Sequence, residues 1–109
     1  LYLCNPPFIA DPDARLYRDG GGDWGIDIGA RIVAETLARL PPGGRLMLFT
    51  GAPVVAGRDV FRGRVAALLE RPDLCHDYGE VDPDIFCEEL LHPPYDRADR
   101  IAAIFLAVT

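Results

Sequence analysis

Residues 40–49 read LPPGGRLMLF, in which a helix breaker leads directly into a run of apolar residues. Two prolines followed by two glycines end any helix that precedes them. A short, continuously apolar strand such as Leu46-Met47-Leu48-Phe49 is typical of strands that are buried on both faces of a parallel sheet. We therefore expect residues 46–49 to form an internal strand of a layered sheet.

Helical and extended patterns alternate on both sides of this strand. Apolar residues recur at helical spacing from Ile26 to Leu40, and a second amphipathic helix is expected from Arg58 to Glu70. Such alternation predicts an α/β layered sheet with right-handed crossovers. The other expected elements are strands at residues 1–4, 74–81 and 101–108, a turn at 51–57, and a short helix that begins at Asp82-Pro83 and reaches about Leu91.

The composition fits one small domain. The chain has 109 residues, a net charge of −6, and arginine at all 11 basic positions. Binding to phosphates requires clustered positive charge, so the acidic balance argues against a nucleic-acid footprint in this segment. No apolar run approaches the roughly 20 residues of a membrane span, and no secretory signal is visible. Because the chain begins inside an apolar run without a methionine, we expect it to be a piece of a longer protein.

Cysteines and acidic residues do not show metal-ligand spacing. Cys4, Cys75 and Cys87 include no C-x-x-C pair, so we expect small buried thiols in a reducing cytoplasm. The acidic stretch at residues 80–89 lacks EF-hand spacing and is expected to be a solvated helix face. The sequence therefore predicts a cytoplasmic protein with no metal site.

The stretch Asn5-Pro6-Pro7-Phe8 follows the first expected strand directly. Ligands of α/β sheets bind beyond the carboxyl ends of the strands, so residues 5–8, here called the corner, lie where a site is expected. Proline has a carbonyl group but no N–H and a fixed φ, so two prolines make a stiff turn with free acceptors. Asn5 adds a side-chain carbonyl and Phe8 a flat apolar face. Together these groups can accept both hydrogens of a planar –NH2 group and stack against the group that bears it.

This set of groups suits methyl transfer from a sulfonium donor to a weakly nucleophilic nitrogen. The lone pair of an amide or aromatic amine is delocalised, so the nitrogen attacks poorly. Acceptors that hold both N–H bonds favour a tetrahedral nitrogen whose lone pair faces the methyl group, and this stabilisation is stronger in the transition state. Positioning for in-line attack supplies the rest, and no acid, thiol or metal is needed.

Three motifs together resemble a known family. They are Asn5-Pro6-Pro7-Phe8, the loop Asp19-Gly20-Gly21 with Gly25, and the stretch from Leu40 to Leu48 that contains Pro-Pro-Gly-Gly. The chain resembles class I S-adenosylmethionine-dependent methyltransferases with an (Asn/Asp)-Pro-Pro-(Tyr/Phe) motif. It is most similar to the HemK-like release-factor glutamine methyltransferases and their "methyltransferase small domain" relatives. The resemblance covers residues 1–51 well and the remainder only in topology.

The resemblance implies a fold and an activity. Residues 1–109 would be the C-terminal half of a Rossmann-like seven-stranded methyltransferase sheet, mostly parallel with an antiparallel last strand. The donor-binding half would precede them in the same polypeptide, with S-adenosylmethionine as cofactor. The acceptor would be a protein glutamine, in a translation factor for instance. By this resemblance Asn5 touches both donor and acceptor, Pro6 offers its carbonyl, Pro7 completes the turn, and Phe8 stacks on the acceptor.

Several alternatives stay open at the level of sequence. The acceptor could instead be the amino group of an RNA or DNA base, because flipped bases can stack on a ring such as Phe8. A non-catalytic scaffold that has lost donor binding is a third reading. Trp24, in the glycine-rich loop, either lines the acceptor pocket or anchors the loop, and Tyr17 and Arg18 are further candidates for substrate contact.

Overall fold

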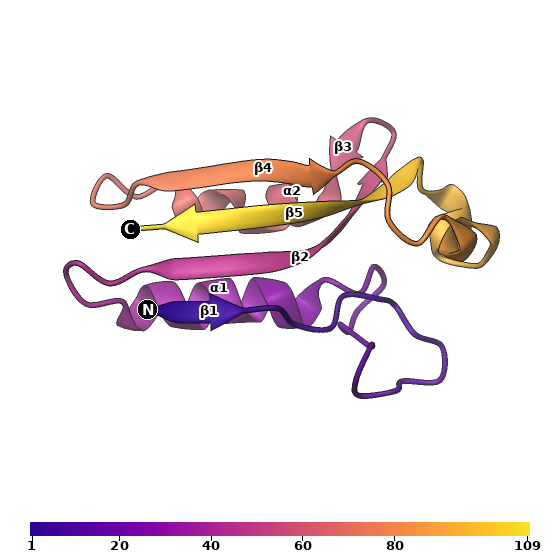
Figure 1. Ribbon diagram of the computed structural model, residues 1–109, viewed down its shortest axis with the longest axis horizontal. Helices are drawn as coiled ribbons and strands as arrows, with labels where there is room; N and C mark the ends of the chain where they lie inside the picture. Colours follow the sequence, from indigo (N-terminus) through magenta and orange to yellow (C-terminus); the bar gives the residue numbers. More distant parts are fainter.

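The computed structural model describes residues 1–109 as one sheet with two α-helices behind it (Figure 1). The elements are β1 (Tyr2–Cys4), α1 (Asp27–Arg39), β2 (Leu46–Val55), β3 (Arg58–Asp59), α2 (Val60–Leu69), β4 (His76–Asp82), the 3-10 helices η1 (Cys87–Leu91) and η2 (Tyr95–Arg97), and β5 (Arg100–Val108). Neither α-helix has the length and hydrophobicity that crossing a bilayer requires.

The sheet is mixed and mostly antiparallel. Its order is β1-β2-β5-β4, and β3 forms a hairpin with β2. Among the paired strands only β1 and β2 are parallel neighbours, in register from Tyr2 opposite Leu46 to Cys4 opposite Leu48. The expected seven-stranded, mostly parallel, Rossmann-like sheet is therefore wrong: the chain forms a five-stranded mixed sheet. The last strand does run antiparallel, pairing with β2 from Leu46–Val108 to Val54–Arg100.

The sheet is mostly antiparallel because β5, the strand that reverses direction, lies between β2 and β4 and pairs with both. A parallel return would need a crossover of a dozen or more residues, usually an α-helix, but only two short 3-10 helices lie between β4 and β5. Moreover, β2 is not buried on both faces. Leu46 and Leu48 are buried against the helices, whereas Met47 and Phe49 are 47% and 39% exposed on the other side of the sheet. Residues 46–49 are all apolar, but their burial alternates along the strand, as in a strand with one exposed face.

The main core lies between the sheet and the two helices. It contains Val33 and Leu37 of α1, Phe61 and Val65 of α2, and inward-facing residues of β2 and β5. A smaller cluster of Ile9, Tyr95 and Ile101 packs at the end of the sheet where β1 finishes. This second cluster joins the loops that follow β1 and β4, so it positions the candidate site.

Other boundaries differ from the expected ones. β2 continues to Val55 through the expected turn, and Asp82 ends β4 instead of capping a helix. The helix after it begins only at Cys87 and is a 3-10 helix. Cys75 and Cys87 are exposed and Cys4 is partly exposed, so the expectation of buried thiols is also wrong. The acidic stretch is split between β4 and η1.

Candidate functional site

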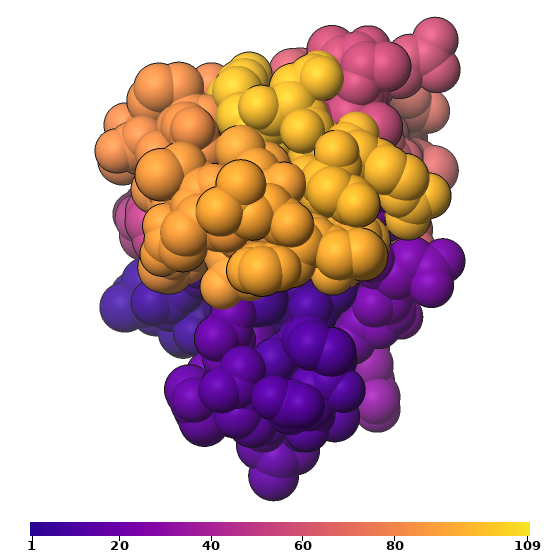
Figure 2. Space-filling view, turned by 90° about the vertical axis from the view of Figure 1, so that its right-hand side faces the viewer, coloured from indigo at the N-terminus to yellow at the C-terminus, as the bar shows by residue number.

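The corner that follows β1 borders a cavity. Residues 5–8 follow the carboxyl end of β1, where the indigo chain leaves the strand and runs toward the right of Figure 1, as the sequence predicted. Viewed from that end, the segment after β4 (orange) lies directly above the loop after β1 (indigo to purple) (Figure 2). The cavity has a volume of ≈ 250 Å³. The residues that line it come from both segments: Asn5, Pro6, Pro7, Phe8, Ile9, Tyr17, Arg18 and Phe86.

Two oxygen acceptors of the corner have no partner within the chain. Asn5 is exposed, and its side chain makes none of the chain's hydrogen bonds. Pro6 is buried with its ring beside Gly29 of α1, and no loop or turn hydrogen bond uses its carbonyl oxygen. The Pro7 carbonyl instead faces the glycine loop, since a Cβ on Gly20 would lie 2.7 Å from its oxygen. The Asn5 side chain and the Pro6 carbonyl are therefore two unpartnered acceptors of residues that line the cavity.

The ring of Phe8 is seated on the sheet. It lies so close to the backbone of Gly51 in β2 that a Cβ at that position would overlap the ring. Gly51 is buried and thus leaves space that no other residue type would leave. The Phe8 ring also meets Phe86, with the two ring centroids 5.8 Å apart and the planes tilted by 38°. Phe8 is therefore held in one place beside the two free acceptors.

Glycines allow the loop after β1 to close tightly on the corner. A Cβ on Gly20 would overlap the carbonyl oxygen of Gly25, and a Cβ on Gly25 would overlap the backbone of Ile9. Gly25 also has φ +73°, which favours glycine. The close approach is fixed by backbone hydrogen bonds: Ile9 N–H donates to the Arg18 carbonyl (3.0 Å), and Gly20 N–H donates to the Ile9 carbonyl (2.8 Å).

Tyr95 joins the two loops that form the site. Its hydroxyl accepts a hydrogen bond from Ala10 N–H (2.7 Å) and donates one to the Trp24 carbonyl (3.2 Å). The side chain is 1% exposed, and burial raises the pKa of Tyr95 to about 12. Tyr95 therefore stays protonated and fixes the corner loop against η2.

Asp11 anchors the same loop by charge. Its buried carboxylate accepts two side-chain hydrogen bonds from Arg15, both at 2.7 Å, and one from the Arg15 backbone N–H (3.0 Å). These hydrogen bonds hold the pKa of Asp11 well below its usual value of about 3.9. The bidentate pair closes the turn that carries Tyr17 and Arg18 into the cavity wall.

The Asp11 pair predicts a loss of stability in acid. Because the folded-state pKa of Asp11 is lowered, the unfolded chain takes up the proton first. The contribution of Asp11 to stability is therefore complete at neutral pH and is lost as the pH falls below about 4. We expect Asp11→Asn to lower the melting temperature at pH 7 and to flatten its decrease in acid. The measurement is thermal unfolding of the full-length protein as a function of pH.

Asp13→Asn is the matched control for this experiment. The Asp13 side chain is 74% exposed and reaches Arg15 only at 3.9 Å, so its loss should leave the pH profile unchanged. An Asp11→Asn profile that coincides with the profile of the natural protein would contradict the role assigned to the pair.

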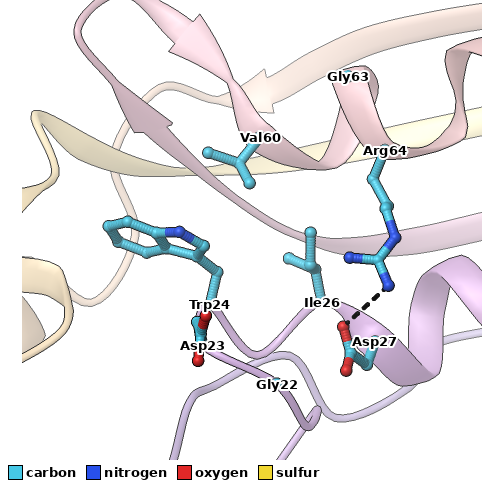
Figure 3. A pocket seen from close by; sticks show the side chains of 8 residues that line it. All are labelled: Gly22, Asp23, Trp24, Ile26, Asp27, Val60, Gly63 and Arg64. Atoms are coloured by element: carbon cyan, nitrogen blue, oxygen red, sulfur yellow. Dashed lines mark ion pairs between the residues drawn. The ribbon is translucent and has the colours of Figure 1, made fainter.

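Trp24 lies outside the corner cavity. It lines a separate hollow of ≈ 520 Å³ between the glycine loop and the first turn of α2, opposite Val60 (Figure 3). Across the same hollow Asp27 and Arg64 form an ion pair at 3.4 Å. The Trp24 ring packs under the guanidinium of Arg97 (5.3 Å), and its carbonyl binds Tyr95. These contacts are those of a loop anchor, so Trp24 does not join Asn5 and Phe8.

Several features of the site were not evident from the sequence. Phe86, Gly51 and Tyr95 reach the corner from distant parts of the chain, and no local motif marks any of them. Tyr17 and Arg18 do line the cavity, and the Asp19 carboxylate accepts a hydrogen bond from Gly21 N–H (3.1 Å), which closes a turn of the glycine loop. No group of three or more His, Cys, Asp or Glu side chains is placed to hold a metal ion.

Comparison of the chain with protein-family models and with curated protein sequences finds no match. The function is therefore inferred from the geometry of the corner itself.

Proposed function

We propose that this protein is an S-adenosylmethionine-dependent methyltransferase that acts on a planar –NH2 nitrogen, and that the acceptor is the side-chain amide of a glutamine in a protein. The observation that carries the proposal is the pair of free acceptors, the Asn5 side chain and the Pro6 carbonyl, at a cavity beside the seated ring of Phe8. The proposal rests on this corner and on its resemblance to the Asn-Pro-Pro-Phe motif, not on the sheet.

The corner supplies catalysis by holding the acceptor. The Asn5 side-chain oxygen and the Pro6 carbonyl accept hydrogen bonds from the two N–H groups of the acceptor amide, while Phe8 stacks on the plane of that amide. This arrangement aligns the nitrogen lone pair with the incoming methyl carbon. As the N–C bond forms, the C–S bond breaks, its electron pair stays on sulfur, and one proton leaves the nitrogen for water. No charged side chain of the corner needs to change its protonation state.

The donor supplies an electrophilic methyl carbon, and Asn5 is the residue of this chain that would touch it. Asn5 is exposed at the edge strand β1, where Leu1 and Leu3 are 79% and 75% exposed. An unpaired strand edge with apolar side chains is a surface that another segment covers. We include in the proposal an upstream, donor-binding half of the same polypeptide that packs against this edge.

Charge favours a protein acceptor over a nucleic acid. The net charge is −6, and the residues around the cavity add an ion pair between Arg18 and Glu89 (2.7 Å) without a free cluster of cations. Phosphate backbones would meet little attraction on such a surface. The exposed thiols of Cys75 and Cys87 support a cytoplasmic location in this proposal, because they persist where the environment is reducing.

Mass spectrometry tests the proposed activity. The full-length protein is incubated with S-adenosylmethionine and candidate glutamine-containing proteins, and the peptides are mapped for an added methyl group. We expect methylation on a glutamine side-chain nitrogen that depends on the donor. Methylation of an RNA or DNA base instead would show that the acceptor is a base amino group and not a glutamine. No methylated product, together with no donor binding by calorimetry, would leave only the non-catalytic scaffold.

A further inference from the structure

The backbone of Phe86 is unusual and is not explained by burial. Its φ of 56° lies in the left-handed region, which bulky residues rarely adopt. The side chain is 46% exposed, so no gain from core packing offsets the strain. Strained residues of this kind persist only where their surroundings fix them, and they concentrate at functional sites.

Hydrogen bonds on both sides hold this conformation. Just before Phe86, the Ile85 N–H donates to the Ile101 carbonyl of β5 (2.7 Å). Phe86 itself is the N-cap of η1, and its carbonyl accepts from Glu89 N–H (2.9 Å). The backbone is thus fixed at the end of the sheet, and the ring is directed over Phe8 at the cavity that Asn5 also lines.

The spacing of the two rings decides what Phe86 does. A flat group inserted face to face between two rings needs about 7 Å between their centroids, because each carbon contact takes about 3.5 Å. The observed separation of 5.8 Å is shorter, so a flat group does not fit between the two rings as they stand, and Phe86 has to move for an acceptor to be held between them. Rotation of an exposed side chain is enough to open this space, since the backbone does not need to move.

Phe86 lines two adjacent cavities. The second, of ≈ 290 Å³, shares Ile9, Tyr17, Arg18 and Phe86 with the first and extends to Glu88 and Glu89. An amide that enters the first cavity can therefore remain attached to a chain that lies in the second. This arrangement fits a side chain of a peptide, whose neighbouring residues occupy the second cavity.

We propose that Phe86 is a specificity-determining residue: it is the movable outer wall of the acceptor site, which turns aside to admit a planar amide and then stacks on the face opposite Phe8. The identity of the acceptor rests on the proposed function, but the binding role of Phe86 does not require turnover. Its ring replaces water on the exposed face of the amide and so contributes to acceptor affinity.

Kinetics of the full-length protein test this role. Phe86→Ala and Phe86→Leu should each raise the KM for a glutamine peptide about 3- to 10-fold, the range of an aromatic contact, with a smaller effect on kcat. Phe86→Tyr keeps the aromatic face and should stay within about twofold of the natural protein. Leu91→Ala is the matched control, because Leu91 lies in η1, is 77% exposed and lines neither cavity.

A binding experiment separates this proposal from the proposed function. The full-length protein with labelled phenylalanine is titrated with N-acetylglutamine amide and followed by NMR. The ring signals of Phe8 and Phe86 should shift together, and the Phe8 shift should saturate at about 3- to 10-fold higher concentration in Phe86→Ala. Ring signals that do not move, or KM values of Phe86→Ala and Leu91→Ala that agree, would overturn the role of Phe86. A failed methylation assay with shifted ring signals would overturn only the activity.

Discussion

Substitution of Asn5 by alanine should lower kcat of the full-length protein by about 10²- to 10³-fold, the usual effect of removing one preorganised hydrogen-bonding group from a reacting centre. In the proposed mechanism, the hydrogen bond from the acceptor N–H to the Asn5 oxygen is strongest as the nitrogen becomes tetrahedral. The loss should therefore appear in kcat and in kcat/KM alike. Methyl transfer from labelled S-adenosylmethionine to a glutamine peptide measures both constants.

The same variant should fold normally. Asn5 is exposed and makes no hydrogen bond within the chain, so we expect its melting temperature to match that of the natural protein. Asp77→Ala is the matched control, because it removes an exposed polar side chain from β4, the opposite edge strand of the sheet. Equal activity of the Asn5→Ala and Asp77→Ala variants would contradict the assigned role of Asn5.

Substitution of Gly20 by alanine should destabilise the protein by about 3 kcal/mol, at the upper end of ordinary single substitutions. A Cβ at this position would overlap the carbonyl oxygen of Gly25 and lie 2.7 Å from that of Pro7. Both atoms are backbone, so no side-chain rotation relieves the contact. Displacement of Pro7 would also move the neighbouring acceptors, and activity should fall with stability. Thermal unfolding followed by circular dichroism measures the first effect.

Gly63→Ala is the control for this substitution. Gly63 is exposed in α2, and a Cβ there would meet nothing within 4 Å. Alanine favours a helix interior by about 1 kcal/mol over glycine, so this variant should be slightly more stable. If Gly20→Ala proved as stable as Gly63→Ala, the tight closure of the loop on the corner would be incorrect.

Local patterns in the sequence predicted the helices and the strands at residues 1–4, 74–81 and 101–108 well, but not how the strands pair. The helices expected at residues 26–40 and 58–70 are confirmed as α1 and α2, because helical spacing and the breakers at Pro41 and Pro72 are local signals. The strand expected at 46–49 is longer, since antiparallel pairing with β5 carries β2 past Gly51 and Pro53. Strand direction depends on partners distant in the chain, which an apolar run does not specify.

The candidate site was likewise predictable only in the part that adjacent residues determine. The position of Asn5 to Phe8 at the end of a strand is confirmed, because it follows from adjacent residues. The seat for Phe8 on Gly51, the cover by Phe86 and the link through Tyr95 join residues more than 40 positions apart. Such contacts arise only when the sheet is assembled. The place of the corner in the fold was therefore predictable, whereas the walls that shape its cavity were not.

A crystal structure of the full-length protein with a glutamine peptide and the demethylated donor product tests the central claim most directly. We predict that the glutamine amide lies on the ring of Phe8 and donates one hydrogen to the Asn5 side-chain oxygen and the other to the Pro6 carbonyl. A peptide bound elsewhere, or an Asn5 side chain turned into a hydrogen bond with its own chain, would contradict the account.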